Sequence, residues 1–79
     1  MPRYHFHCAD GSREPDVDGI ELANDEAAQQ EAVALAGQIL KDDPKLIWNK
    51  GQWRVEVTDD SNMLLFTVVT LAMDAPRPA

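Results

Sequence analysis

Apolar and polar residues alternate at the start of the chain. Tyr4, Phe6 and Cys8 fall on one side of an extended strand, and His5 and His7 fall on the other. This alternation predicts a first β-strand over residues 3–8 with one buried face. The Asp-Gly pair that follows predicts the turn that ends it, and residues 12–19 have the composition of a loop.

A helical period occupies the middle of the chain. Asn24 is a suitable N-cap, and apolar residues recur at three- and four-residue spacing over residues 25–40. The apolar side is mostly alanine, which allows the helix to lie close to a sheet, and Gly37 suggests the same close approach. The Asp-Asp-Pro sequence ending at Pro44 predicts the end of this amphipathic helix.

Two further strands are predicted in the second half. Residues 52–58 alternate with Trp53 on the apolar side, residues 59–62 have turn chemistry, and residues 63–71 form an apolar run that pairs back as a hairpin. Because this last strand is apolar on both sides, we expect it in the middle of the sheet. The expected fold is therefore α+β with element order β-α-β-β. Its three-stranded antiparallel sheet has strand order 1-3-2, and one amphipathic helix packs on one face.

Length and composition indicate one small folded unit. The chain has 79 residues, of which 44% are hydrophobic and 27% are charged. These values are ordinary for a globular protein, so we expect a single domain over residues 1–73 and a frayed tail over residues 74–79. Residues 45–51 are expected to form a connection whose apolar residues Leu46, Ile47 and Trp48 are candidates for a lid over the core.

Charge and cysteine content limit the partners and the compartment. The net charge of −7 opposes binding to nucleic acid phosphates or to anionic membranes, so we expect neither partner. A single cysteine cannot form an internal disulfide, and the chain contains no apolar run long enough for a membrane span. We therefore expect a soluble cytoplasmic protein.

The two histidines have two interpretations. His5 and His7 project to the same side and could share a metal ion with the loop carboxylates of Asp10, Asp16 and Asp18. Alternatively, His5 faces solvent, and His7 is structural because it ties the first strand to the acidic loop through Asp10 or a backbone carbonyl. The loop also partly imitates a calcium-binding loop, with Glu14, Asp16 and Asp18 at alternate positions, but no helix is expected to precede it.

Catalytic chemistry has little support. Cys8 and His7 are consecutive strand residues and face opposite sides, so they cannot act as a nucleophile and its base. No Gly-rich phosphate loop or Cys-x-x-Cys pair is present. We expect neither an enzyme nor a cofactor, and a small hydrolase that uses His7 and the acidic residues is a lesser alternative.

The two tryptophans receive different roles. Trp53 shares the apolar alternation of its strand and is predicted to be a structural core residue. Trp48 lies outside any such pattern. It is interpreted either as a lid over the core, which the small size of the domain favours, or as an exposed anchor for a partner.

Several short motifs together resemble a known family. They are Met1-Pro2-Arg3-Tyr4, Phe6-His7, Asp10-Gly11, Asp18-Gly19 before Leu22, the alanine-rich helix, and the run from Trp53 to Asp59. This set resembles the DUF6894-type family of short alphaproteobacterial proteins of unknown function. The resemblance implies a small α+β module without an established activity. His7 matches the family's histidine, whereas His5 stands where the family usually has an aromatic residue.

These observations favour a small acidic, non-catalytic interaction or regulatory module. Its expected partner is another protein or a second copy of the chain, added at an open edge of the sheet. A metal-binding protein that uses His5, His7 and the loop carboxylates is the alternative.

Overall fold

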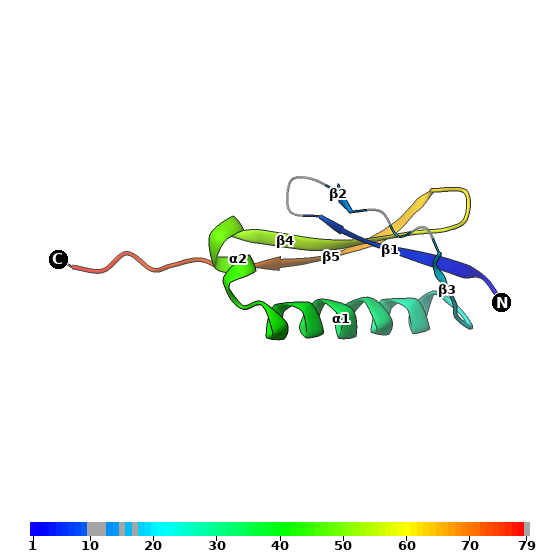
Figure 1. Cartoon of the computed structure of the whole chain (residues 1–79), viewed down its shortest axis with the longest axis horizontal. Helices are drawn as coiled ribbons and strands as arrows, with labels where there is room; N and C mark the ends of the chain where they lie inside the picture. Colours follow the sequence, from blue (N-terminus) through cyan, green and yellow to red (C-terminus); the bar gives the residue numbers. More distant parts are fainter. Residues whose placement is uncertain (10–12, 15, 17, 79) are drawn as a thin grey trace.

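A long helix lies along one face of an antiparallel sheet in this computed structural model, which describes residues 1–9, 13–14, 16 and 18–78 (Figure 1). The elements in chain order are β1 (Arg3–Ala9), β2 (Arg13–Glu14), β3 (Ile20–Glu21), α1 (Asp25–Asp42), α2 (Lys45–Lys50), β4 (Gln52–Thr58) and β5 (Leu64–Leu71). The predicted α+β class, with an antiparallel sheet and a packed helix, is confirmed.

The predicted three strands in the order 1-3-2 are wrong. The described residues form a five-stranded sheet in the order β2-β1-β4-β5, and β3 pairs with β1 as well. The strand that carries Trp53, β4, is central because it pairs with β1 on one side and with β5 on the other. The last strand, β5, is therefore an edge strand. Its apolar residues on both sides do not reflect a central position, because none of its eight residues is buried and five of them are exposed.

Helix α1 begins and ends much as its sequence predicts. The Asn24 side chain accepts a hydrogen bond from the Ala27 N–H at 2.9 Å, and the helix continues to Asp42, two residues beyond the predicted end. The Tyr4 hydroxyl donates a hydrogen bond to Asp25 in the first turn at 2.7 Å. That hydrogen bond, together with burial and the carboxylate charge, raises the pKa of Tyr4 to about 12. This contact joins β1 to the start of the helix.

The prediction of a single helix is wrong, because the connection between α1 and the second half of the sheet contains the short helix α2. Gly51 closes it in a left-handed conformation with φ of 76°, and its N–H donates to the Ile47 carbonyl. Residues 72–78 contain neither helix nor strand and extend away from the sheet (Figure 1). In the described part of the chain, neither helix is long and apolar enough to cross a membrane.

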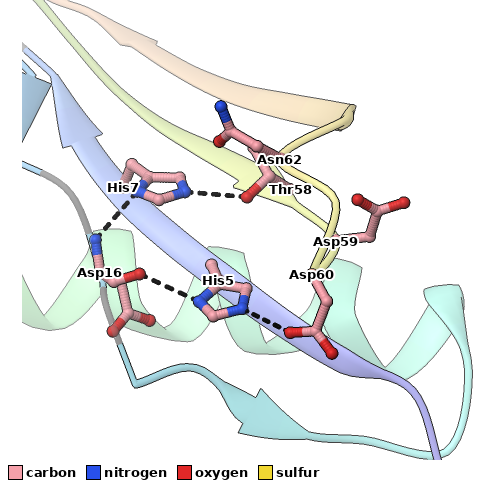
Figure 2. Close-up of a pocket in the computed structure, with 7 residues that line it drawn as sticks. All are labelled: His5, His7, Asp16, Thr58, Asp59, Asp60 and Asn62. Atoms are coloured by element: carbon pink, nitrogen blue, oxygen red, sulfur yellow. Dashed lines mark hydrogen bonds and ion pairs between the residues drawn. The ribbon is translucent and has the colours of Figure 1, made fainter.

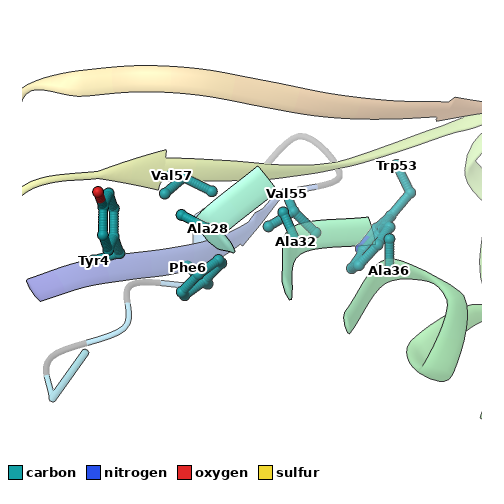
Figure 3. Packing of buried hydrophobic residues seen from close by; sticks show 8 residues of the cluster. All are labelled: Tyr4, Phe6, Ala28, Ala32, Ala36, Trp53, Val55 and Val57. Carbon is teal, nitrogen blue, oxygen red and sulfur yellow. The ribbon is translucent and has the colours of Figure 1, made fainter. Parts of the chain in front are cut away.

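The core lies between α1 and the β1–β4 pair (Figure 3). Its buried members are Tyr4, Phe6, Ala28, Ala32, Ala36, Trp53, Val55 and Val57. The three alanines bring the helix backbone close to the sheet. Gly37 has no part in this approach, because it is exposed and a Cβ atom there would have no neighbour within 4 Å.

The tryptophans occupy opposite environments. Trp53 is 3% exposed and lies in the core, as its alternation predicts. Trp48 is 62% exposed, so the favoured lid interpretation is wrong. Leu46 and Ile47 of α2 pack against the core instead, because only one side of this six-residue helix faces it.

Candidate functional site

The two histidines meet Asp16 and the β4–β5 turn at one surface of the sheet (Figure 2). They line a pocket of about 230 Å³ together with Asp16, Thr58, Asp59, Asp60 and Asn62. Sites for small organic ligands usually occupy about 300 to 1,000 Å³, so this pocket has room for water or an ion rather than for a metabolite.

Asp16 docks the acidic segment onto β1 through its backbone and its side chain together. Its carboxylate accepts hydrogen bonds from the N–H groups of Phe6 at 3.1 Å and Gly19 at 3.2 Å. Partial burial raises the pKa of Asp16, but these N–H donors and the nearby His5 ring outweigh that effect and leave the pKa lowered. The Phe6 N–H thus has an acceptor on the edge of β1 opposite β4, between the residues that pair with β3 and those that pair with β2.

Gly19 makes this close approach possible. Its φ is +74°, and an added Cβ atom would lie 2.9 Å from Arg3 Cγ, from His5 Cε1 and from the Tyr4 carbonyl oxygen. A side chain at this position would strain the backbone and push the segment away from β1. The glycine of the Asp18-Gly19 motif is thus required because this segment packs tightly against β1.

His7 is buried and its ring is hydrogen-bonded at both nitrogens. Nδ1 accepts the Asp16 N–H at 2.9 Å, so Nε2 carries the proton and donates to the Thr58 hydroxyl oxygen at 2.9 Å. His7 therefore ties β1 to the acidic segment, but through a backbone N–H rather than a carbonyl. Asp10, the other expected partner, lies outside the described residues.

His5 does not face solvent freely, in contrast to the expectation for this residue. Its side chain is 14% exposed, its Nδ1 lies 3.0 Å from the Asp16 carbonyl oxygen and its Nε2 lies 2.8 Å from Asp60 Oδ1. Both neighbours are acceptors, so a doubly protonated ring satisfies both. The hydrogen bond to Asp60 is the main reason why the pKa of His5 is raised, although burial opposes it. The Asp60 carboxylate lies in the turn between β4 and β5, fifty-five residues from His5. The sequence pattern around His5 could not reveal this partner.

The geometry offers little to a metal ion in this arrangement. Both nitrogens of His7 and both nitrogens of His5 are engaged, and a metal ligand must present a free lone pair. Asp18 is exposed and lies outside the pocket. Among the described residues, no group of three or more His, Cys, Asp or Glu side chains is arranged to hold a metal ion.

The arrangement also gives little support for hydrolysis by His7 and a hydroxyl nucleophile. The Thr58 hydroxyl oxygen lies 2.9 Å from His7 Nε2, but His7 donates its proton to that oxygen. A general base must accept a proton from its nucleophile. The His7–Thr58 pair therefore acts as a structural hydrogen bond between β1 and β4.

The second candidate surface is the outer edge of β5. The run from Met63 to Met73 contains no charged residue and no proline, although the chain has fourteen acidic and seven basic residues. Its large apolar side chains are exposed by 36% to 76%, namely Met63, Leu64, Leu65, Val69, Leu71 and Met73. Isolated edge strands in monomers are usually protected by charges, prolines or covering segments.

The opposite edge of the sheet is covered by the chain itself. β3 pairs with Arg3 and Tyr4, Asp16 accepts the Phe6 N–H, and β2 pairs with Cys8 and Ala9. No described segment pairs with the outer side of β5. The molecule therefore closes one edge of its sheet and leaves the other open.

Comparison with family models shows which family the chain belongs to. The model of the family described as "Domain of unknown function (DUF6894)" matches residues 3–72. The chain belongs to this family, which confirms the resemblance seen in the sequence motifs. Searches of curated proteins and of solved structures found no match.

Proposed function

We propose that this protein is a small, non-catalytic interaction module that adds a strand from another polypeptide to the open edge of β5. The observation that carries the proposal is the exposed, uncharged edge of β5, with which no described segment pairs, in an otherwise acidic chain. Strand addition uses the unpaired backbone groups of an edge for affinity and its side chains for selectivity.

The magnitude of the exposed surface supports a binding role. Complete burial of one aliphatic side chain contributes about 1.5 to 3 kcal/mol, so covering six side chains that are roughly half exposed contributes at most about 4.5 to 9 kcal/mol. Association costs about 4 to 15 kcal/mol in lost freedom. The apolar surface alone therefore supports weak binding, and the backbone hydrogen bonds of an added strand would strengthen it.

The histidine pocket has a supporting role in this proposal. His5, His7 and Asp16 hold the acidic segment over β1 and join it to the β4–β5 turn. This arrangement covers the β1 edge, so β5 is the edge that the described residues leave for pairing. The single cysteine and the acidic surface support a cytoplasmic location.

Capture from a lysate of the native host tests the proposal with three baits. Wild type is compared with Val69→Lys, which puts a charge on the β5 edge, and with Val33→Lys, which puts the same charge on α1. The two valines are matched in exposure, 53% and 60%. We expect the proteins captured by wild type to be retained by Val33→Lys and lost by Val69→Lys. Identical capture by all three baits would refute a role for β5.

A further inference from the structure

The open edge of β5 raises the question of which polypeptide covers it. We infer that its occupant is a second copy of this chain, paired antiparallel through β5 about a two-fold axis at Val68. This inference rests on the proposed function and names the partner of the same edge.

The register of the hairpin determines which backbone groups point outward. The Ala72 N–H donates to the Gly51 carbonyl at 3.1 Å, and the β4–β5 register continues as Gln52 opposite Leu71 and Trp53 opposite Thr70. Hydrogen-bonded and non-hydrogen-bonded pairs alternate along an antiparallel ladder. The N–H and C=O groups of Thr67, Val69 and Leu71 are therefore directed to the open side.

A two-fold axis at Val68 matches these outward groups with each other. Thr67 of one copy lies opposite Val69 of the other, so each donates to and accepts from its partner. The same axis places Met63 of one copy opposite Met73 of the other. Every residue of the uncharged run 63–73 then lies opposite a residue of the same run in the other copy. A two-fold axis at any other residue would leave part of the run opposite residues outside it.

The side chains on both faces of the sheet fit this pairing. Phe66 and Val68 share the helix-covered face with Val57 and Val55, their partners on β4, but remain only half-buried because no described segment flanks β5 on its outer side. A second β5 would bring the same residues alongside them. On the opposite face, the exposed Val69 would gain an uncharged Thr67 as its cross-strand neighbour.

Charge within the β5 run gives no advantage to a basic partner, although two copies, each with a net charge of −7, repel each other at long range. All fourteen acidic residues lie outside the run from Met63 to Met73, so a basic polypeptide would find no carboxylate within that run. A second copy can approach there without placing carboxylates directly opposite each other. Antiparallel pairing also brings the acidic β4–β5 turn of one copy toward the α2 end of the other, where the exposed Lys45 and Lys50 lie beside the exposed carboxylates at the end of α1. A parallel arrangement would instead bring like ends together.

Sedimentation equilibrium over a range of protein concentrations tests the inference. We expect wild type to approach twice the 8.8 kDa mass of the chain as concentration rises. Val69→Pro removes an outward N–H without removing a bond to β4, and we expect it to raise the dimer dissociation constant by more than about tenfold. Circular dichroism verifies that this variant is folded.

Cross-linking locates the contact independently of that variant. Val68 would meet its own copy as a non-hydrogen-bonded pair, with Cα atoms about 4.5 Å apart, so Val68→Cys should form an intermolecular disulfide under mild oxidation. Val33→Cys, which is more exposed than Val68 and lies on α1, is the control and should not. A wild-type mass equal to one chain at every concentration, or equal cross-linking of the two variants, would overturn the inference. If a monomeric wild type still captured a lysate protein that Val69→Lys lost, self-pairing alone would be refuted and the proposed function would stand.

Discussion

Replacing Asp16 by alanine is predicted to destabilise the fold substantially. The substitution removes the acceptor of two backbone N–H groups, Phe6 on β1 and Gly19 in the docked segment. Hydrogen bonds to a charged group contribute about 1.5 to 3 kcal/mol each, and Asp16 is only partly buried, so we expect a loss of about 2 to 4 kcal/mol. A domain of this length has a total stability of roughly 4 to 12 kcal/mol. The variant should therefore lose a large fraction of it.

Urea denaturation followed by tryptophan fluorescence measures this loss, and Asp18→Ala is the matched control. Asp18 is exposed, and its carbonyl, which accepts a hydrogen bond from Arg3, is retained in the variant. We expect its unfolding free energy to change by less than about 0.5 kcal/mol. Equal denaturation midpoints for Asp16→Ala and Asp18→Ala would refute the docking of the segment by Asp16.

The pH dependence of the same comparison supplies a second check. The pKa of Asp16 is lowered in the folded protein, so its stabilisation is present above the unfolded pKa and is lost as pH falls through the folded pKa. Wild type and Asp16→Ala should therefore differ fully at pH 7 and converge below about pH 4. A gap that is constant down to pH 2 would show that the carboxylate charge does not contribute.

Three further predictions concern the core, His5 and metal. Trp53→Ala should lower the unfolding free energy by about 3 to 5 kcal/mol because the ring is buried, whereas Trp48→Ala should change it by less than about 0.5 kcal/mol; denaturant midpoints in the reverse order would show that the core is misassigned. The pKa of His5 is raised in the fold by Asp60, so its stabilisation is present below the unfolded pKa and fades as pH rises through the folded pKa. His5→Gln should thus lose more stability at pH 5.5 than at pH 8.5, and a background of Asp60→Asn should reduce that difference; an equal loss at both pH values would contradict it. A chelator should leave the melting temperature unchanged, and zinc should give no binding heat in calorimetry, because the histidine nitrogens are already hydrogen-bonded. A fall in melting temperature of several degrees on chelation would restore the metal-binding alternative.

Local patterns predicted the elements whose signals are themselves local. Asn24 marks the start of α1 because an N-cap acts on the next turn of the same segment. The alternation around Trp53 placed that ring in the core because neighbouring residues of one strand have fixed faces. Neither inference required knowledge of a distant segment.

The misplaced features depend on distant segments. The two apolar sides of β5 suggested a central strand, but alternation reports the polarity of each face and not the number of flanking strands. Asp16 was considered as a metal ligand, whereas its partners are Phe6, ten residues away, and the two histidine rings. The role of His5 depends on Asp60, which is fifty-five residues away and reaches it only after the β4–β5 hairpin has formed.

Site-resolved amide hydrogen exchange at low and high protein concentration tests most directly whether the chain closes one sheet edge and pairs through the other. The Phe6 amide, bonded to Asp16, should be protected at every concentration. The outward amides of Thr67, Val69 and Leu71 should exchange rapidly in dilute solution and become protected as concentration rises. Rapid exchange of these three amides at all concentrations, with no captured partner that protects them, would contradict the assignment of β5 as the interaction edge.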